Sequence, residues 1–424
     1  MLDSMRRFYY WSNEITVKPD YTLSPALFFK TLLSRSDRFS HLSGPDVPPV
    51  SNVYFTYGFH YAFLQAPGMS NYIGVVTFIN KGGAADLAGL ERGSYFTKVN
   101  GAAIQAQNMD AINGLLNSGS GNVVLTTATY NNGQWQEERE TGISPGYMSE
   151  NAVYYTRLFT QNNVRTGYLY YTSFNETYDG NLLNAFVKLR DQQVNELILD
   201  LRYNAGGSVA SCAKLAALIS DRLTANEVFA IYQGNQYEGR QSQTLQSVLN
   251  TSGNPAGRPF SALQARQLHL NRVFILTTKA TVSAAELIIN NLKPFINVIQ
   301  IGDVTTGKDE ASFTIRDMRN PRQVDWILQP IVYKLFNKNG QGGYAQGISP
   351  QYAVDETAQL PLGSIGSNAD VLIHKGLELI YGPGFTGNPA DLRDAAPGHL
   401  IRTSGRYQSS VKQAEMAAPV VINR

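Results

Sequence analysis

From about residue 150 onward, β-rich stretches alternate with helical stretches, and this alternation constrains the fold more than any other feature of the sequence. The stretch 196–201 is nearly continuous hydrophobe, which is typical of a strand covered on both faces. Alternation of this kind predicts βαβ units on a largely parallel sheet. The expected strands span 165–174, 196–202, 228–232, 272–278, 297–302 and 325–337, and the expected helices span 178–192, 207–220, about 261–268, and 283–292.

Three further segments accompany this α/β region. A chain of 424 residues is long enough for two or three domains. Near the N-terminus, Ser24 and Pro25 are suited to begin a helix over about 24–33. Short β-rich runs follow, separated by Gly and Asn turns and by one short helix at 84–88. We therefore expect an N-terminal helical segment (1–46), a β-rich domain (47–140), the α/β domain (141–385) and a C-terminal tail rich in Gly, Pro, Ala and Ser (386–424).

Composition excludes several classes of function. The formal net charge is only +2 and no Lys- or Arg-rich block occurs, so nothing favours nucleic acid or an anionic membrane as a partner. The longest apolar stretches, such as 273–276, are far shorter than the roughly 20 residues of a membrane span. Residues 1–7 lack an apolar h-region, so no secretory leader is expected in the sequence as given, and a cleaved leader stays open. The lone Cys212 excludes an internal disulfide and a cysteine-based metal site, and we expect a small buried hydrophobe.

A serine and a lysine stand at the ends of two consecutive predicted strands. Ser283 lies where the strand over 272–278 turns into a helix, and a serine there is by default a helix N-cap. Lys308 follows 25 residues later, after the next predicted strand. A strand–helix–strand unit of that length returns the chain beside its start, so both side chains can face one cleft at the C-terminal edge of the sheet. The pair is compatible with a serine nucleophile and a lysine base, provided that burial or nearby positive charge keeps the lysine neutral.

Two adjacent glycines, Gly206 and Gly207, end a buried strand directly before a helix. Such glycines let backbone N–H groups approach a ligand closely, and the helix dipole favours negative charge there. The place suits a phosphate or an oxyanion, although the spacing of a P-loop is missing, and a purely structural turn is the alternative. The five histidines lie in separate contexts without a G-x-S-x-G or H-E-x-x-H motif, so no histidine-based site is expected.

The β-rich region carries a peptide-binding pattern. Residues 83–93, followed by 98–101, resemble the central stretch of a PDZ domain. In such domains a short loop offers backbone N–H groups to the terminal carboxylate of a peptide, and the corresponding residues here are Tyr57, Gly58 and Phe59. The peptide would then add as an extra strand beside the strand that begins at Phe59, with its last side chain in an apolar pocket. The alternative is that Gly58 is only a turn glycine.

Together these elements resemble the tail-specific, or C-terminal-processing, serine peptidases, a family with a PDZ domain and a serine–lysine dyad. The resemblance covers most of the chain, with the motifs in one order along it. The motifs are the PDZ-like unit, 200–207, 283–286, 302–308 and 347–350, preceded by Trp11, Pro19 and 37–40 near the N-terminus.

The resemblance implies a crotonase-like α/β peptidase domain in which Ser283 is the nucleophile and Lys308 is the general base. The oxyanion of the attacked carbonyl would be held by the N–H of Ala284 and by the turn of Gly206 and Gly207. No metal or cofactor is implied.

Some residues near the dyad match the family and others depart from it. Glu286 matches a family glutamate that would orient the dyad or the neighbouring backbone, or it only favours the helix N-terminus electrostatically. Ser312 stands four residues after Lys308, where many relatives carry glutamine, and could make similar hydrogen bonds. Asp309 and Glu310 follow the lysine directly, and carboxylates there favour its charged form unless they point to solvent.

Three functions are therefore weighed. The first is a serine endopeptidase that captures substrates by an apolar C-terminus, and the second is a catalytically silent, peptide-binding adaptor. The third, a crotonase-like acyl-CoA enzyme, would require neither the PDZ-like unit nor the dyad. Because proteins of this resemblance work outside the bacterial cytoplasm, we expect a periplasmic or envelope-attached protein.

Overall fold

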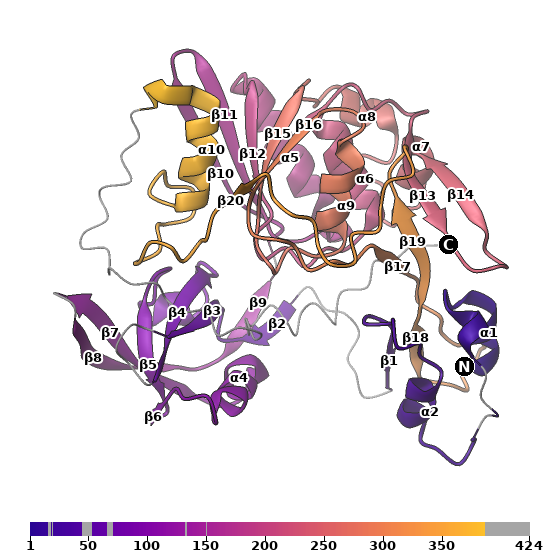
Figure 1. Cartoon of the computed structure of the whole chain (residues 1–424), viewed down its shortest axis with the longest axis horizontal. Coiled ribbons are helices and arrows are strands. Elements are labelled where there is room, and N and C mark those ends of the chain that lie inside the picture. Colours follow the sequence, from indigo (N-terminus) through magenta and orange to yellow (C-terminus); the bar gives the residue numbers. More distant parts are fainter. Residues whose placement is uncertain are drawn as a thin grey trace.

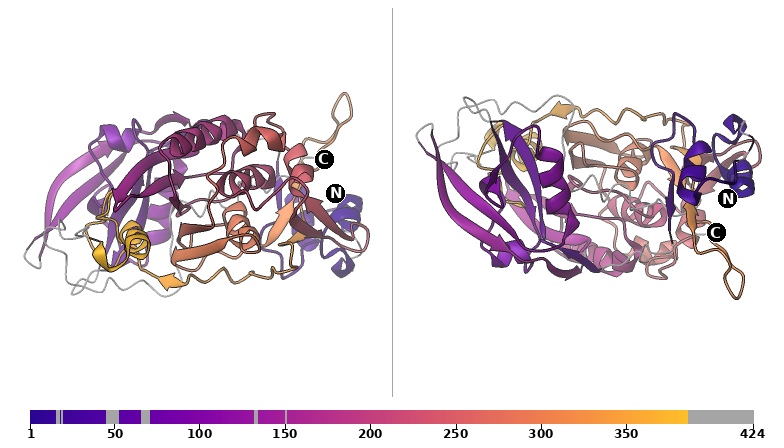
Figure 2. Two further views of the ribbon diagram at one scale, coloured as in Figure 1. Left: turned by 90° about the horizontal axis from the view of Figure 1, so that it is seen from above. Right: turned by 90° about the horizontal axis from the view of Figure 1, so that it is seen from below.

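The computed structural model describes residues 1–385 apart from 16–17, 19, 45–52, 66–70, 132–133 and 150. The predicted tail at 386–424, the boundary near 46 and Pro19 lie outside the described residues. Figure 2 shows the N-terminal segment and the β-rich unit at opposite ends of the molecule, with the α/β unit between them.

A six-stranded sheet organises the α/β unit (Figure 1), in the order β10-β11-β12-β15-β16-β20. The strands are β10 (Val153–Gln161), β11 (Val164–Tyr171), β12 (Glu196–Asp200), β15 (Arg272–Thr277), β16 (Asn297–Gly302) and β20 (Tyr352–Ala353). Only the pair β10-β11 is antiparallel, and the other four pairs are parallel. The predicted, largely parallel sheet is confirmed.

Helices cover both faces of this sheet. Leu197 and Leu199 of β12 pack in one core with Phe186, Leu215 and Ile288, which belong to α5 (Asp179–Asp191), α6 (Val209–Ile219) and α9 (Ala284–Leu292). On the other face, Ile198 packs with Leu377 of α10 (Val371–Tyr381) and with Phe78 of the β-rich unit. The hydrophobic stretch 196–201 is therefore buried on both sides, as its composition predicts.

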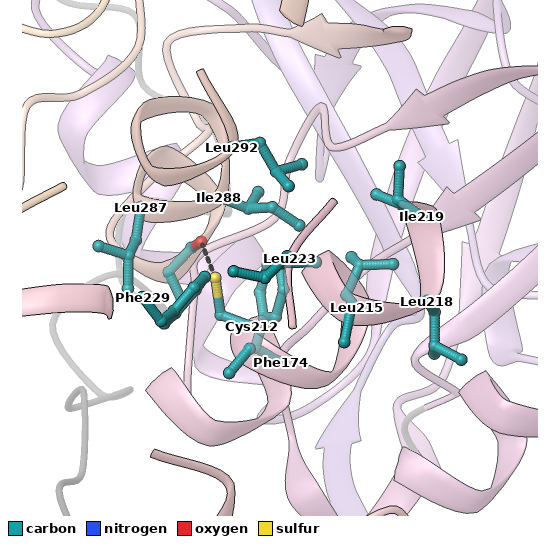
Figure 3. Packing of buried hydrophobic residues seen from close by; sticks show 14 of the residues in the cluster. Phe174, Cys212, Leu215, Leu218, Ile219, Leu223, Phe229, Leu287, Ile288 and Leu292 are labelled. Carbon is teal, nitrogen blue, oxygen red and sulfur yellow. Dashed lines mark hydrogen bonds between the residues drawn. The ribbon is translucent and has the colours of Figure 1, made fainter. Parts of the chain in front are cut away.

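Cys212 lies inside this core as the sequence predicts. It is buried on α6, and its Sγ lies 3.5 Å from the carbonyl oxygen of Ala284 in the first turn of α9 (Figure 3). Figure 3 also shows Leu287, Ile288 and Phe229 around the sulfur. The packing of α6 against α9 thus continues to within one residue of Ser283.

The long strand predicted over 325–337 is wrong. Pro330, which has no N–H for a sheet ladder, separates β18 (Ile327–Gln329) from β19 (Ile331–Phe336). β18 pairs with β1 (His41–Ser43) of the N-terminal segment. β19 joins a second sheet in the order β14-β13-β19-β17, made with β14 (Arg240–Thr244), β13 (Val228–Gln233) and β17 (Glu310–Ser312). The predicted strand at 228–232 therefore belongs to this antiparallel sheet and not to the parallel one.

The β-rich unit is built on one antiparallel sheet in the order β3-β4-β5-β7-β8, with β6 paired to β5. Its strands are β3 (Phe59–Gln65), β4 (Tyr72–Ile79), β5 (Tyr95–Val99), β6 (Ala102–Ala103), β7 (Val123–Asn131) and β8 (Gln134–Ile143), with helices α3 (Ala84–Leu87) and α4 (Met109–Ser118). The expected boundary at 140 falls inside β8, because the ladder with β7 continues to Ile143. A separate ribbon of β2 (Val53–Thr56) and β9 (Gly146–Ser149) follows, so the unit extends to Ser149.

The remaining elements are short. The N-terminal segment contains α1 (Leu2–Phe8), η1 (Ser12–Glu14) and α2 (Pro25–Thr31). Ser24 occupies the N-cap position of α2 as predicted, but its side chain makes no capping hydrogen bond. Elsewhere the chain forms η2 (Glu176–Tyr178), α7 (Leu245–Asn250), α8 (Phe260–Gln264) and η3 (Gly382–Gly384). Within the described ranges, no helix has the length and apolar character needed to span a membrane.

A buried charge network joins the β-rich unit to the α/β unit. Arg202, directly after β12, donates to Asp200 at 3.0 Å and to Asp370 at 2.7 Å. It also donates to Glu356 at 3.0 Å. Arg92 of the β-rich unit donates to the same Glu356 at 2.7 Å and to Asp370 at 3.0 Å. Since a buried charge without its partner is strongly destabilising, this network fixes the end of β12 from both units.

Candidate active site

Ser283 forms a strained elbow between β15 and α9. Its backbone has φ 59° and ψ −115°, a left-handed φ that residues other than glycine rarely adopt. The residue is only 2% exposed, and its Oγ has no hydrogen-bond partner among the described residues. Ser283 is the N-cap residue of α9, as the default expectation has it, but its side chain makes no capping hydrogen bond. Backbone strain of this kind clusters at functional sites.

Glu286 links this elbow to the loop that carries Lys308. Its Oε2 accepts from the N–H of Ser283 and from the N–H of Lys308, both at 2.8 Å. Its Oε1 accepts from the N–H of Gly307 at 2.7 Å and from the hydroxyl of Thr305 at 2.5 Å. Burial raises the pKa of the Glu286 carboxyl, and the four hydrogen bonds act against that rise.

The structure therefore brings Ser283 and Lys308 together, because one carboxylate oxygen binds the backbone of both residues. Lys308 follows β16 and is 5% exposed. Its Nζ lies 5.1 Å from the centroid of the Phe39 ring. The loop that carries Lys308 is also contacted by Ile348, whose N–H donates to the Thr305 hydroxyl at 2.7 Å. This contact gives the 347–350 motif a structural role.

The two carboxylates that follow the lysine do not point to solvent. Asp309 and Glu310 are both buried, and Lys334 of β19 donates to them at 2.7 and 2.5 Å. Burial raises the pKa of the Glu310 carboxyl. Burial also opposes the charge on Lys334, but the hydrogen bonds that it donates to Asp309 and Glu310 raise its pKa overall. A neighbouring cation, rather than water, thus compensates the two carboxylates.

The glycine turn lies against the serine elbow. Gly206 has φ 96°, and a Cβ there would lie 2.7 Å from the Cβ of Ser283, so no side chain fits. The N–H of Gly206 donates to Oδ1 of Asn204 at 2.8 Å. In the described part of the chain, neither the N–H of Gly207 nor that of Ala284 donates to a protein acceptor. Two backbone donors beside Ser283 are therefore open to a ligand.

Asn204 holds the turn and the elbow together. Its side-chain amide donates to the carbonyl oxygen of Tyr171 at 2.9 Å. Its backbone carbonyl oxygen accepts from the N–H of Val282 at 3.0 Å. Asn204, Thr305 and Lys334 are the contributors to this site that the sequence did not single out. Asn204 lies beside the glycines, but the contacts of Lys334 depend on the second sheet, which no local pattern indicates.

A second serine and lysine, Ser252 and Lys214, are also in contact, but their other partners give this pair a structural role. Lys214 of α6 donates to the Ser252 hydroxyl at 2.8 Å, but it also donates to the buried Asp179 at 2.5 Å. The Nζ of Lys214 is thus held in a buried ion pair with Asp179. The hydroxyl of Ser252 is also engaged, with Glu176 at 3.2 Å.

The predicted peptide-capture residues belong to the β-rich unit. β3 is an edge strand of its sheet, which pairs with β4 alone among the described strands. Tyr57 and Phe59 are buried in the core of this unit. Gly58 has φ 81°, and its N–H donates to Oγ1 of Thr56 at a long 3.3 Å. The side chain of Met148 packs on Gly58, since a Cβ there would lie 2.7 Å from its sulfur.

The described residues contain no group of three or more His, Cys, Asp or Glu side chains placed to hold a metal ion. The site itself offers an unpaired serine hydroxyl, a buried lysine and two open backbone donors.

Comparisons with known proteins agree in pointing to one family. A model described as Peptidase family S41 matches residues 165–354, and one described as Peptidase S41 N-terminal domain matches residues 1–41. The crystal structure of a putative S41 protease from Bacteroides fragilis is similar over 90% of this chain and 96% of that chain, with 26% identity and a TM-score of 0.73. The mixed α/β arrangement is therefore one found in S41 proteases.

Two curated relatives are similar in sequence. The chain is 24% identical over 282 residues to a "Probable CtpA-like serine protease" of Staphylococcus aureus, which is 66% of this chain and 50% of the relative. A protein of the same description from Staphylococcus saprophyticus is 24% identical over 293 residues, 69% of this chain and 53% of the relative. The chain thus spans about half the length of the curated relatives it matches.

Proposed function

Because the chain belongs to peptidase family S41, we propose that it is a serine endopeptidase of the C-terminal-processing class, with Ser283 as nucleophile and Lys308 as general base. The observation that carries the proposal is the shared Glu286 oxygen, which holds the backbones of both residues beside an unpaired serine Oγ. On this reading the domain around the site is the crotonase-like peptidase domain.

Acylation follows from the placement of these groups. Neutral Lys308 takes the proton of the Ser283 hydroxyl as Oγ bonds to the peptide carbonyl carbon, and the C=O electron pair moves onto oxygen. The oxyanion accepts hydrogen bonds from the N–H groups of Gly207 and Ala284. Gly206 is not a donor, because its N–H is bound by Asn204. When the tetrahedral species collapses, the C–N bond breaks and the Lys308 ammonium returns its proton to the leaving amine.

Deacylation repeats these roles with water. Neutral Lys308 takes a proton from water as the water oxygen attacks the ester carbonyl, and the same two N–H groups hold the second oxyanion. The C–O bond to Ser283 then breaks, Oγ recovers a proton from the lysine, and a carboxylic acid leaves. Glu286 touches no substrate in this scheme, so it is a positioning residue.

Substrate capture is assigned to the β-rich unit, which we take to be a PDZ-like domain. A peptide would add along the open edge of β3, and its terminal carboxylate would displace the long Gly58–Thr56 hydrogen bond. The preference for an apolar last residue rests on the PDZ-like resemblance, since Tyr57 and Phe59 pack in the core of the unit. By the same family reasoning, the protein acts outside the cytoplasm, in the periplasm or attached to the envelope. The alternative function is a catalytically silent, peptide-binding adaptor, which would be indicated if no substrate is cleaved.

The lysine base predicts the pH dependence of turnover. Between pH 6 and 10, kcat/KM for an unfolded model protein is expected to rise as Lys308 loses its proton, since only the neutral amine accepts the serine proton. The measurement is a pH series with chemistry rate-limiting. A flat profile over this range would contradict a lysine base.

Lys334 is expected to keep the base active at neutral pH. In Lys334→Gln, Asp309 and Glu310 lose their cation, and the two carboxylates then favour protonated Lys308. The midpoint of the pH profile is expected to rise by roughly 0.5–1 unit. Lys338→Gln is the matched control, because Lys338 pairs with Glu227 instead. An unmoved midpoint in Lys334→Gln would show that the acidic pair does not act on the base.

A further inference from the structure

We propose that the turn at residues 37–40 of the N-terminal segment is part of the catalytic centre. In this proposal Phe39 is a positioning residue that screens the Lys308 amine from water, and Arg38 holds the loop that carries the lysine. The catalytic meaning of this arrangement rests on the proposed peptidase function, whereas the screening itself can be tested without it.

The turn is organised by its own first residue. Oδ1 of Asp37 accepts from the N–H groups of Phe39 and Ser40 at 2.9 and 2.8 Å. Oδ2 of Asp37 accepts from the hydroxyl of Tyr9 at 2.7 Å, and that hydroxyl in turn accepts from the N–H of Ser34 at 2.9 Å. Burial raises the pKa of Tyr9, so its hydroxyl stays protonated and continues to donate. The conformation of the turn is therefore fixed before any substrate binds.

The turn is also docked firmly on the α/β unit. The guanidinium of Arg38 donates to the carbonyl oxygens of Gly307 and Ala345, the latter at 3.0 Å. Gly307 directly precedes the lysine and has φ 89°, and a Cβ there would clash with the carbonyl oxygen of Ala345, so no side chain fits. The Ser40 hydroxyl accepts from the N–H of Ile331 at 2.7 Å. Pairing of β1 with β18 extends the attachment beyond the turn.

Phe39 is the residue that this docking presents to the lysine. Its ring centroid lies 5.1 Å from Nζ of Lys308, and the lysine is 5% exposed. The ring has two opposite effects: by excluding water it disfavours the ammonium, and by its quadrupole it favours the ammonium. A leucine would retain the first effect without the second, and an alanine would retain neither.

Some of the other ionisable groups around the lysine contact Phe39 itself. The Arg38 guanidinium lies 4.7 Å from the centroid of the Phe39 ring, and Nδ1 of His41 lies 3.4 Å from the Phe39 carbonyl oxygen. Burial lowers the pKa of His41, which keeps its ring neutral near the lysine. The titratable and charged groups on the packed elements are Asp37, Arg38 and His41 of the N-terminal segment, Glu286 of α9, Asp309 and Glu310 beside the lysine, Lys334 of β19 and Tyr344 of the following loop. A substitution at Phe39 removes none of these charges, but it removes the ring that lies against both Lys308 and Arg38.

The test compares Phe39→Ala with Phe39→Leu in the full chain. Protein labelled with 13C at the lysine ε-carbon is titrated by NMR, and the Lys308 signal is identified by its loss in Lys308→Gln. The pH profile of kcat/KM is recorded in parallel. Tyr21→Ala is the matched control, since this aromatic residue of the same segment stacks on Phe28.

We expect the Lys308 midpoint to rise by roughly 0.5–1 pH unit in Phe39→Ala, because water then stabilises the ammonium. In Phe39→Leu and Tyr21→Ala the midpoint should not rise. A midpoint unmoved in Phe39→Ala would overturn the proposal, even if activity fell. If the NMR shift occurs but no variant or wild-type protein cleaves a substrate, the screening stands and the proposed peptidase function fails.

Arg38→Gln keeps the proposal testable if Phe39→Ala does not fold. It retains the aromatic ring but releases the loop at Gly307, so kcat should fall roughly tenfold with KM nearly unchanged. The Lys308 midpoint should also rise as water enters. A normal midpoint and a normal kcat in Arg38→Gln would refute a role for the turn.

Discussion

Replacing Ser283 by alanine is expected to lower kcat/KM for an unfolded protein substrate by about a thousandfold or more, because no other group supplies the nucleophile. Lys308→Ala should give a loss of similar size, since residues that act as one unit are not additive. The measurement is cleavage of the same substrate by the variants and the unmodified chain under identical conditions.

Ser252→Ala is the matched control for this experiment. Ser252 also contacts a lysine, but that lysine is bound to Asp179 and the hydroxyl is engaged with Glu176. Its replacement should change kcat/KM by only a few-fold. If Ser283→Ala cleaved as fast as the unmodified chain, the assigned nucleophile would be wrong.

Removing the Glu286 carboxylate is the second substitution with a large expected effect. In Glu286→Ala, the N–H groups of Ser283, Gly307 and Lys308 and the hydroxyl of Thr305 lose their acceptor. Buried donors without partners cost about 1–3 kcal/mol each, so the free energy of unfolding should fall by about 3 kcal/mol or more. Because the elbow and the lysine loop are then no longer tied, kcat/KM should fall by roughly a hundredfold even in the folded fraction.

Glu286→Gln separates the two effects of the carboxylate. In this variant the side-chain amide oxygen still accepts the hydrogen bonds made to one of the two carboxylate oxygens. The NH2 group that replaces the other oxygen faces backbone N–H groups and cannot accept from them. Stability and kcat/KM should both lie between those of the unmodified chain and Glu286→Ala, as measured by urea unfolding and by cleavage. A loss of stability with unchanged kcat/KM in Glu286→Ala would mean that this residue serves the helix N-terminus and not the dyad.

The parts of this architecture that follow from the sequence are those set by local pattern. The hydrophobic stretch 196–201 predicts a doubly covered strand, and the spacing from Ser283 to Lys308 predicts that the two residues meet. The first is confirmed by the cores on the two faces of β12. For the second, a right-handed strand–helix–strand unit returns the chain to a neighbouring strand, where Glu286 binds the backbone N–H groups of both residues, and their action as a dyad stays a prediction.

The parts that the sequence does not reveal depend on long-range pairing. The neutralisation of Asp309 and Glu310 comes from Lys334 on another strand, and the break at Pro330 sends the two halves of one apparent strand to different sheets. Helix α4 was also missed, because Asn113 and Gly114 within it are poor helix formers and its stability comes from packing of residues such as Ile112.

The proposed nucleophile can be tested most directly by covalent labelling of the unmodified chain with a fluorophosphonate, followed by mass mapping of the modified peptide. We predict one adduct, on Ser283, which forms faster as the pH rises from 6 to 9 and is lost in Lys308→Ala. An adduct on another serine, or equal labelling of Ser283 in Lys308→Ala, would contradict a Ser283–Lys308 peptidase.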